Sequence, residues 1–246
     1  MNNIEKVKEV AAALPVDRFK HGLSTLHLWI RCMEFVLHIA YRTDFKKWYA
    51  SGPLRDIIKE KQKKCQQQLR ETLGIVVDVP KSGGSGTSND GNTARRFFRA
   101  HKEVAQILDI NESLIKRLYI ALCVLSANRH IDEKKLMEFN AETYDLYLSL
   151  YKWFNMPQAV HKMLAHSHQI VAIKAIPIGS LSEEPQESSN KIFKYTREHH
   201  TRKIAREKTN FHLMSHMLCN SDPKISIMRR QAVWKLPSGT FWSLTT

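Results

Sequence analysis

The chain has 246 residues, 43% of them hydrophobic, which is enough for one core of ordinary size or two small ones. Lysine and arginine number 38 against 24 aspartate and glutamate residues, so the formal net charge is +14 and the isoelectric point is near 9.7. This balance predicts attraction to polyanions, with nucleic acid ahead of an anionic membrane surface, although a basic surface that only aids solubility has the same composition.

The four cysteines are scattered without CxxC spacing, which excludes a disulfide framework and a cysteine-rich zinc site and fits a reducing compartment. The N-terminus lacks the apolar segment of a secretory signal. The most apolar stretch, 23–41, is interrupted by His27, Arg31, Glu34 and His38, so it predicts a buried or amphipathic helix rather than a membrane span. We therefore expect an intracellular protein with no membrane partner.

Helical spacing of apolar residues recurs through most of the chain. Asn111 and the pair Glu183–Glu184 suit helix N-termini, and Pro157 suits a first turn. The expected helices cover 4–14, 23–41, 54–73, 93–108, 111–127, 132–154, 160–171 and a segment from Ser182 past Arg206.

Strand character is confined to the β-branched run 75–79 and, more weakly, to 170–176. Segment 81–92 holds four of the nine glycines and predicts a flexible loop. The tail from residue 226 lacks periodicity. The expected organisation is an N-terminal helical segment with a remnant strand, a Gly/Ser-rich loop, a helical C-terminal region and an irregular tail, with bounds 1–80, 81–92, 93–225 and 226–246.

The glycine-rich loop does not match the spacing of a P-loop or of GxGxxG, so it is a weak candidate for a nucleotide site. Directly after it, Arg95 and Arg96 fall in the first turns of a predicted helix. Helix N-terminal amides and guanidinium groups together suit DNA phosphates. Two solvated arginines beside a core contact of Phe97 and Phe98 are the alternative interpretation.

A second basic segment covers 191–208, where Phe193 and Tyr195 are available for packing or for stacking on bases. The alternative is a simple solvated face. Its predicted DNA-binding residues are Lys191, Lys194, Arg197, Arg202 and Lys203.

The pair His161 and His166 suggests a metal site. A five-residue offset places two side chains about 140° apart on a regular helix, and zinc needs further ligands that are not close in sequence.

Four stretches together, in this order, resemble the Transib-type transposases and the related catalytic core of the V(D)J recombinase, over about residues 22–225. They are Ser24-Thr-Leu-His27 with Glu34-Phe35, Gly91-Asn-Thr-Ala-Arg-Arg96, Val160-His-Lys-Met-Leu-Ala-His166, and Glu187-Ser-Ser-Asn-Lys-Ile-Phe-Lys194. The resemblance implies an RNase H-like fold in which three carboxylates hold two Mg²⁺ or Mn²⁺ ions for in-line attack on a phosphodiester.

By the same resemblance Glu187 looks like the last of the three carboxylates, and Arg95 and Arg96 look like a DNA-contacting pair. His161 and His166 look like zinc ligands whose paired cysteines are missing here. A first-turn acid favoured by the helix dipole is the alternative interpretation of Glu187.

The chain departs from the family where catalysis needs acids. The second carboxylate should follow a strand that ends at Leu26-His27, but Trp29 stands there and the next acid is Glu34. The first carboxylate and its strands would precede this point by roughly a hundred residues in the family pattern, and only 28 residues stand there. A single carboxylate cannot assemble a two-metal site.

The expected fold is therefore mainly α, multi-helical with one or two short strands, an incomplete remnant of an RNase H-like transposase core. The expected function is that of a nuclear, transposase-derived DNA-binding protein that lacks a complete catalytic site. The alternatives are an active DDE-type nuclease or strand transferase, and a helical remnant that packs against itself or a longer transposase copy without binding DNA.

Overall fold

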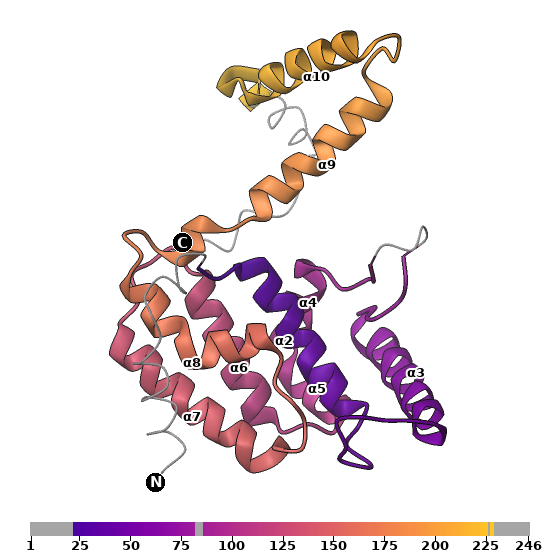
Figure 1. Ribbon diagram of the computed structural model, residues 1–246, viewed down its shortest axis with the longest axis vertical. Coiled ribbons are helices and arrows are strands. Elements are labelled where there is room, and N and C mark those ends of the chain that lie inside the picture. Colours follow the sequence, from indigo (N-terminus) through magenta and orange to yellow (C-terminus); the bar gives the residue numbers. More distant parts are fainter. Residues whose placement is uncertain (1–21, 82–85, 226, 229–246) are drawn as a thin grey trace, which may run out of the picture. The chain divides into compact units, whose positions relative to one another are not determined.

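The structure, a computed structural model, describes residues 22–81, 86–225 and 227–228. Helices dominate this part of the chain, so the mainly α prediction is confirmed (Figure 1). The expected helix over 4–14 and nearly all of the tail from 226 lie outside the described residues. The elements in chain order are α2 (Thr25–Ala40), α3 (Pro53–Leu73), α4 (Gly91–Arg99), α5 (His101–Leu108), α6 (Glu112–Ser126), α7 (Glu133–Tyr151), α8 (Gln158–Ala172), the 3₁₀ helix η2 (Ile178–Leu181), α9 (Glu184–His199) and α10 (Arg206–Ser221).

Internal contacts divide the chain into two compact units between Glu183 and Glu184. Unit 1 contains α2 to α8 and η2, and unit 2 contains α9 and α10. The four-part organisation expected from composition has different bounds and stays a prediction.

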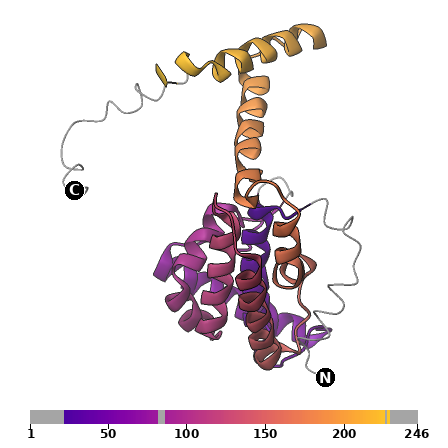
Figure 2. The same cartoon turned by 90° about the vertical axis from the view of Figure 1, so that its left-hand side faces the viewer.

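Helix α2 is the centre of unit 1 and lies between α8 and α4, with α6 against it as well (Figures 1 and 2). Cys32, Val36 and Leu37 on this helix are completely buried. A helix that is apolar around most of its circumference belongs in a protein interior or a bilayer, and here it is the axis of a helical bundle. Across the described ranges, no helix combines the length and the apolar character that crossing a membrane requires.

Side-chain caps begin several of these helices, because the first amides of a helix have no partner within it. The Asn111 side chain accepts from the Leu114 amide at 3.0 Å, which confirms it as the N-cap of α6. The Asp90 carboxylate accepts from the Thr93 amide at 2.7 Å and begins α4 directly after the glycine-rich loop.

The expected strands are wrong. In the described residues the sole β-bridge joins Pro80 to Thr87. Segment 75–79 has no partner strand because side chains satisfy its backbone: Asn89 accepts from the Asp78 amide at 2.9 Å, and Gln66 donates to the Val77 carbonyl at 3.0 Å. Residues 170–172 complete α8 instead of starting a strand. Leu26 and His27, expected at a strand end, lie in the first turn of α2.

Two helix predictions have wrong bounds. The helix expected over 93–108 is interrupted at Ala100, whose ψ of 38° ends α4 and begins α5. The helix expected to run past Arg206 ends at His199. A turn follows it, and Thr209 of α10 donates to the Arg202 and Ala205 carbonyls at 2.9 and 3.1 Å. These local bonds satisfy the turn. Across it, Thr196 Oγ1 of α9 lies 3.3 Å from His216 Nδ1 of α10, and we call the two connected helices the α9–α10 hairpin.

Candidate nucleic-acid interface

Helix α9 places three of the predicted DNA-binding cations, Lys191, Lys194 and Arg197, on an exposed surface. Arg202 and Lys203 lie in the turn that follows and are exposed too. Within the part of the chain that the structure describes, no ion pair involves any of these five cations. Unit 2 therefore offers five hydrated positive charges that a phosphate chain can engage without breaking an ion pair.

Glu187, the expected third carboxylate, lies in the first turn of α9 and is exposed. Over the described ranges, no group of three histidine, cysteine or acidic side chains is placed to hold a metal ion. Glu187 fits the helix-dipole interpretation, in which an acid near a helix N-terminus is stabilised by the amides there.

Arg96 is tied to the end of α3. Its Nη2 donates to the Leu73 and Gly74 carbonyls at 3.0 and 3.2 Å, and these are among the C-terminal carbonyls that a helix leaves without partners. Arg95 lies with its guanidinium carbon 5.3 Å from the Trp29 ring centroid and is half-buried. Arg95 and Arg96 therefore both contribute contacts that hold unit 1 together, a role that their position in sequence does not reveal.

Replacing Arg96 with alanine is expected to lower the free energy of unfolding by about 1 kcal/mol, because two charge-assisted hydrogen bonds to α3 disappear at an exposed site. Urea denaturation followed by circular dichroism measures this. The exposed Lys102→Ala on α5 is the control and should leave the unfolding curve unchanged. Equal curves for wild type and Arg96→Ala would show that the bonds to α3 contribute nothing.

Trp29, which stands where the resemblance places the second carboxylate, is a core residue. Its ring is 3% exposed and its Nε1 donates to Ser126 Oγ at 2.9 Å. The next acid, Glu34, is paired with Arg31 at 2.8 Å and accepts from Asn89 at 3.2 Å. Through these contacts, Trp29 and Glu34 both stabilise the packing of α2.

A cluster that the sequence did not reveal joins Ser24, His27 and Glu183. Ser24 Oγ donates to Glu183 Oε2 at 2.8 Å, and His27 Nδ1 lies 2.7 Å from Ser24 Oγ and 3.3 Å from the same carboxylate oxygen. In a serine–histidine–acid relay the hydroxyl and the acid contact opposite ring nitrogens. Here both contact Nδ1, so the cluster caps α2 and is not arranged for nucleophilic catalysis.

His161 and His166 are closer than their offset along α8 predicts. Their ring centroids are 5.3 Å apart at 79°, and His166 Nδ1 lies 3.1 Å from Gln169 Oε1. Burial first, and then the neighbouring His166, lower the pKa of His161. The structure thus brings the two suspected zinc ligands together. It adds no third histidine, cysteine or acid to them from the described residues.

The half-buried His161 and His168 of α8 predict an acid-sensitive fold. Burial lowers the pKa of His161 and the pKa of His168. The pKa of His168 is lowered further by the neighbouring His166, while the carboxylate of Glu133 on α7 acts to raise it. A folded-state pKa below the unfolded value of about 6.5 means that the unfolded chain binds more protons as pH falls. Stability is therefore complete above about pH 6.5 and decreases as the pH falls from there towards the folded pKa values.

Thermal unfolding at pH 7.5 and at pH 5.5 measures this decrease. The double variant His161→Gln/His168→Gln should show a smaller difference between the two melting temperatures than wild type. An unchanged difference would mean that other groups cause the acid sensitivity.

Comparison of the chain with protein-family models and with curated proteins finds no match.

Proposed function

We propose that the protein is a transposase-derived DNA-binding protein, and that the α9–α10 hairpin supplies the main contacts to the phosphate backbone. The observation that supports this is the group of five exposed cations, unpaired among the described residues, on one two-helix unit. Arg95 and Arg96 add positive charge near the start of α4 in unit 1. The proposed partner is DNA, and the proposed compartment is the nucleus.

The proposal includes the absence of a working catalytic site. Two-metal phosphoryl transfer needs clustered carboxylates. Glu187 is exposed on unit 2, while Trp29 is packed in the core of unit 1. Cleavage or strand transfer by the purified protein with Mg²⁺ or Mn²⁺, abolished in Glu187→Gln, would contradict this part of the proposal and favour the active enzyme.

A mobility-shift titration with duplex DNA at several salt concentrations tests the binding. If six or more phosphates are contacted, affinity falls on the order of a thousandfold between 50 and 200 mM salt, because bound cations release condensed counterions. A nearly salt-independent affinity, or no binding at 50 mM, would refute DNA binding through these cations.

Self-association through the hairpin is a second candidate, favoured by its exposed apolar side chains. Thr196 and Leu213 are buried, whereas seven large apolar residues of the hairpin are 41% to 82% exposed. These are Ile192, Phe193, Tyr195, Ile204, Phe211, Met214 and Leu218. A surface of this kind is typical of a protein interface.

The distribution of charge along α9 suits a second copy of the chain as the partner. Glu184 and Glu187 lie in the first turn, and Arg197 and His199 lie in the last. Two such helices packed antiparallel about a two-fold axis place the acids of each opposite the bases of the other. Sedimentation equilibrium of wild type and Ile192→Glu tests this, since only wild type should dimerise. A monomeric wild type at micromolar concentration would exclude it.

A further inference from the structure

Helix α3 lies at the edge of unit 1 (Figure 1). An open groove runs between this helix and the extended segment 76–79. Its volume is about 530 Å³. Helix α3 supplies Lys63, Gln66, Gln67, Arg70 and Glu71 to one wall, and Val76, Val77 and Val79 line the other. The Glu71 carboxylate accepts from Gln67 Nε2 at 2.9 Å. Among the described helices α3 packs chiefly on α5, which leaves this wall open to solvent.

The positive charges of the groove are not neutralised within the fold. Among the described residues, neither Lys63 nor Arg70 takes part in an ion pair. Other lysines of the same helix do have acidic partners: Lys61 contacts Asp44 at 2.5 Å, and Lys59 contacts Asp56 at 3.5 Å. The two cations that face the groove are therefore available to an anionic ligand.

The opposite wall is held in place before any ligand arrives. Gln66 Nε2 donates to the Val77 carbonyl at 3.0 Å, and Ser88 Oγ donates to the Val76 carbonyl at 3.0 Å. Val76 and Val79 remain 40% and 43% exposed. The groove thus combines an apolar wall with a wall that carries two cations and one carboxylate.

The spacing of the cations matches a nucleic-acid strand. Seven residues separate Lys63 from Arg70, so the two side chains leave the same side of α3 about 10 Å apart along its axis. A DNA strand carries one phosphate per roughly 3.4 Å of helix axis, so this separation spans about three phosphates. Arg96, bonded at the C-terminal end of α3, continues the positive charge beyond Arg70.

We propose that this groove is a second contact for the DNA backbone, in which Lys63 and Arg70 bind phosphates and the exposed valines pack against deoxyribose. The inference rests on the proposed DNA binding and extends it from unit 2 to unit 1. An acidic peptide would also meet two cations here, but their separation along α3 and the further positive charge of Arg96 at the end of the helix favour the repeated charges of a nucleic acid.

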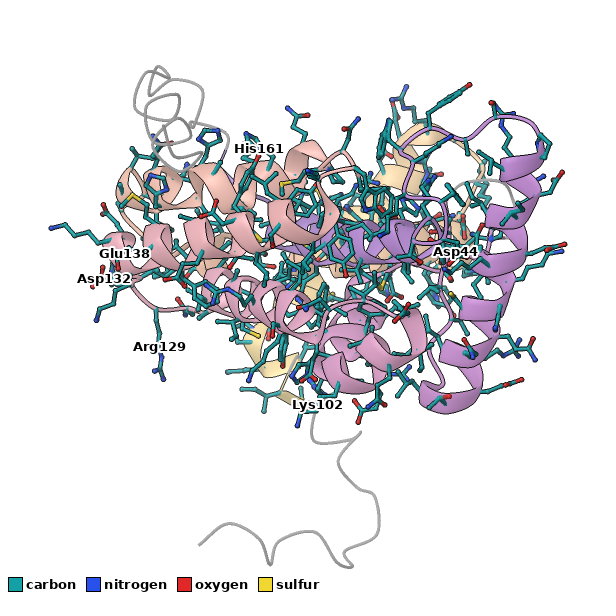
Figure 3. The ribbon with its side chains drawn as sticks, turned by 90° about the horizontal axis from the view of Figure 1, so that it is seen from below. Asp44, Lys102, Arg129, Asp132, Glu138 and His161 are labelled. Carbon is teal, nitrogen blue, oxygen red and sulfur yellow. The ribbon has the colours of Figure 1, made fainter. Side chains whose placement is uncertain are left out.

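The test compares two charge-reversal variants by fluorescence anisotropy with duplex DNA at 100 mM salt. Lys63→Glu/Arg70→Glu changes the groove, and Lys102→Glu/Arg129→Glu makes the same change in net charge at exposed positions of unit 1 that do not line the groove (Figure 3). Because the groove variant can no longer hold two of the phosphates, it should bind on the order of a hundredfold more weakly, and the slope of log affinity against log salt should decrease by about 2. The control should weaken by less than about threefold, since its two cations do not touch the DNA.

An equal loss of DNA affinity in the two variants would show that the affinity depends on net charge alone. It would contradict the proposal that the groove contacts DNA. Unchanged affinity of the groove variant beside a wild type that binds DNA would overturn the groove and leave the proposed function intact. A wild type that does not bind DNA refutes the proposed function itself. If circular dichroism shows that the glutamate variant has less helix than wild type, Lys63→Gln/Arg70→Gln replaces it, with an expected decrease in affinity of about fiftyfold at the same salt.

Discussion

Changing Lys191, Lys194 and Arg197 to glutamate should lower the affinity for duplex DNA by on the order of a thousandfold at 100 mM salt. Each phosphate contact contributes a counterion-release term of roughly tenfold under these conditions, and reversing the charge adds repulsion. All three side chains are exposed on α9, so the substitutions need not disturb the interior of the hairpin. Mobility shift gives the affinity and circular dichroism gives the helix content.

The control for this variant reverses Lys102, Lys116 and Arg129, three exposed cations of unit 1. The two proteins then have the same net charge and differ in where it was changed. A comparable decrease in DNA affinity in both variants would mean that binding depends on the overall charge of +14 and not on the cations of α9. If the α9 variant binds DNA with the affinity of wild type, the hairpin is not part of the DNA interface.

Gly179→Ala is expected to lower the free energy of unfolding by about 3 kcal/mol, at the upper end of the cost of overpacking a filled site. A β-carbon at this position would lie 2.4 Å from the Ala127 carbonyl oxygen and 2.5 Å from that of Ser126. Both atoms belong to the backbone at the end of α6, so neither can rotate away. Relief requires η2 to move off α6, which it contacts directly.

Urea denaturation gives the free energy of unfolding of Gly179→Ala and Gly91→Ala. The comparison separates the cost of a clash with the backbone from that of a clash with a side chain. A β-carbon on Gly91 would meet the Leu26 Cδ1 methyl at 2.5 Å, and a methyl group at the end of a side chain can shift. We expect a decrease of about 1 kcal/mol for Gly91→Ala. A decrease below that value for Gly179→Ala would mean that η2 adjusts easily and does not fix the segment that leads to unit 2.

The helical part of the fold could be predicted because its signals are local. Apolar spacing predicts α2, and the side chain of Asn111 makes the cap that its position suggests. The strand prediction for segment 75–79 is wrong because its β-branched residues have strand propensity, but the segment has no partner strand. Side chains of Gln66, Ser88 and Asn89 satisfy its backbone instead, and nothing within the segment indicates that.

The candidate site was predictable as residue types but not as contacts. The exposure of Lys191 and Lys194 follows from the polarity of their segment. Arg96 bonds to carbonyls 22 and 23 residues earlier in the chain, and no local pattern encodes that pairing. His161 and His166 meet despite their offset because ring position depends on side-chain torsions as well as on helix angle. The groove beside α3 had one usable signal, two cations seven residues apart in a lysine- and glutamine-rich helix.

The α9–α10 hairpin has few buried side chains, and this determines how its local unfolding is linked to ligand binding. With little more than Thr196 and Leu213 shielded from water, local opening of the two helices costs far less free energy than opening α2, so their amides should exchange with deuterated solvent early. A phosphate chain that neutralises α9 stabilises the closed helices, and part of the association energy is spent on ordering them. Amide protection in α9 would then report occupancy of the hairpin directly, while the amides of α2 stay protected whether or not a ligand is bound.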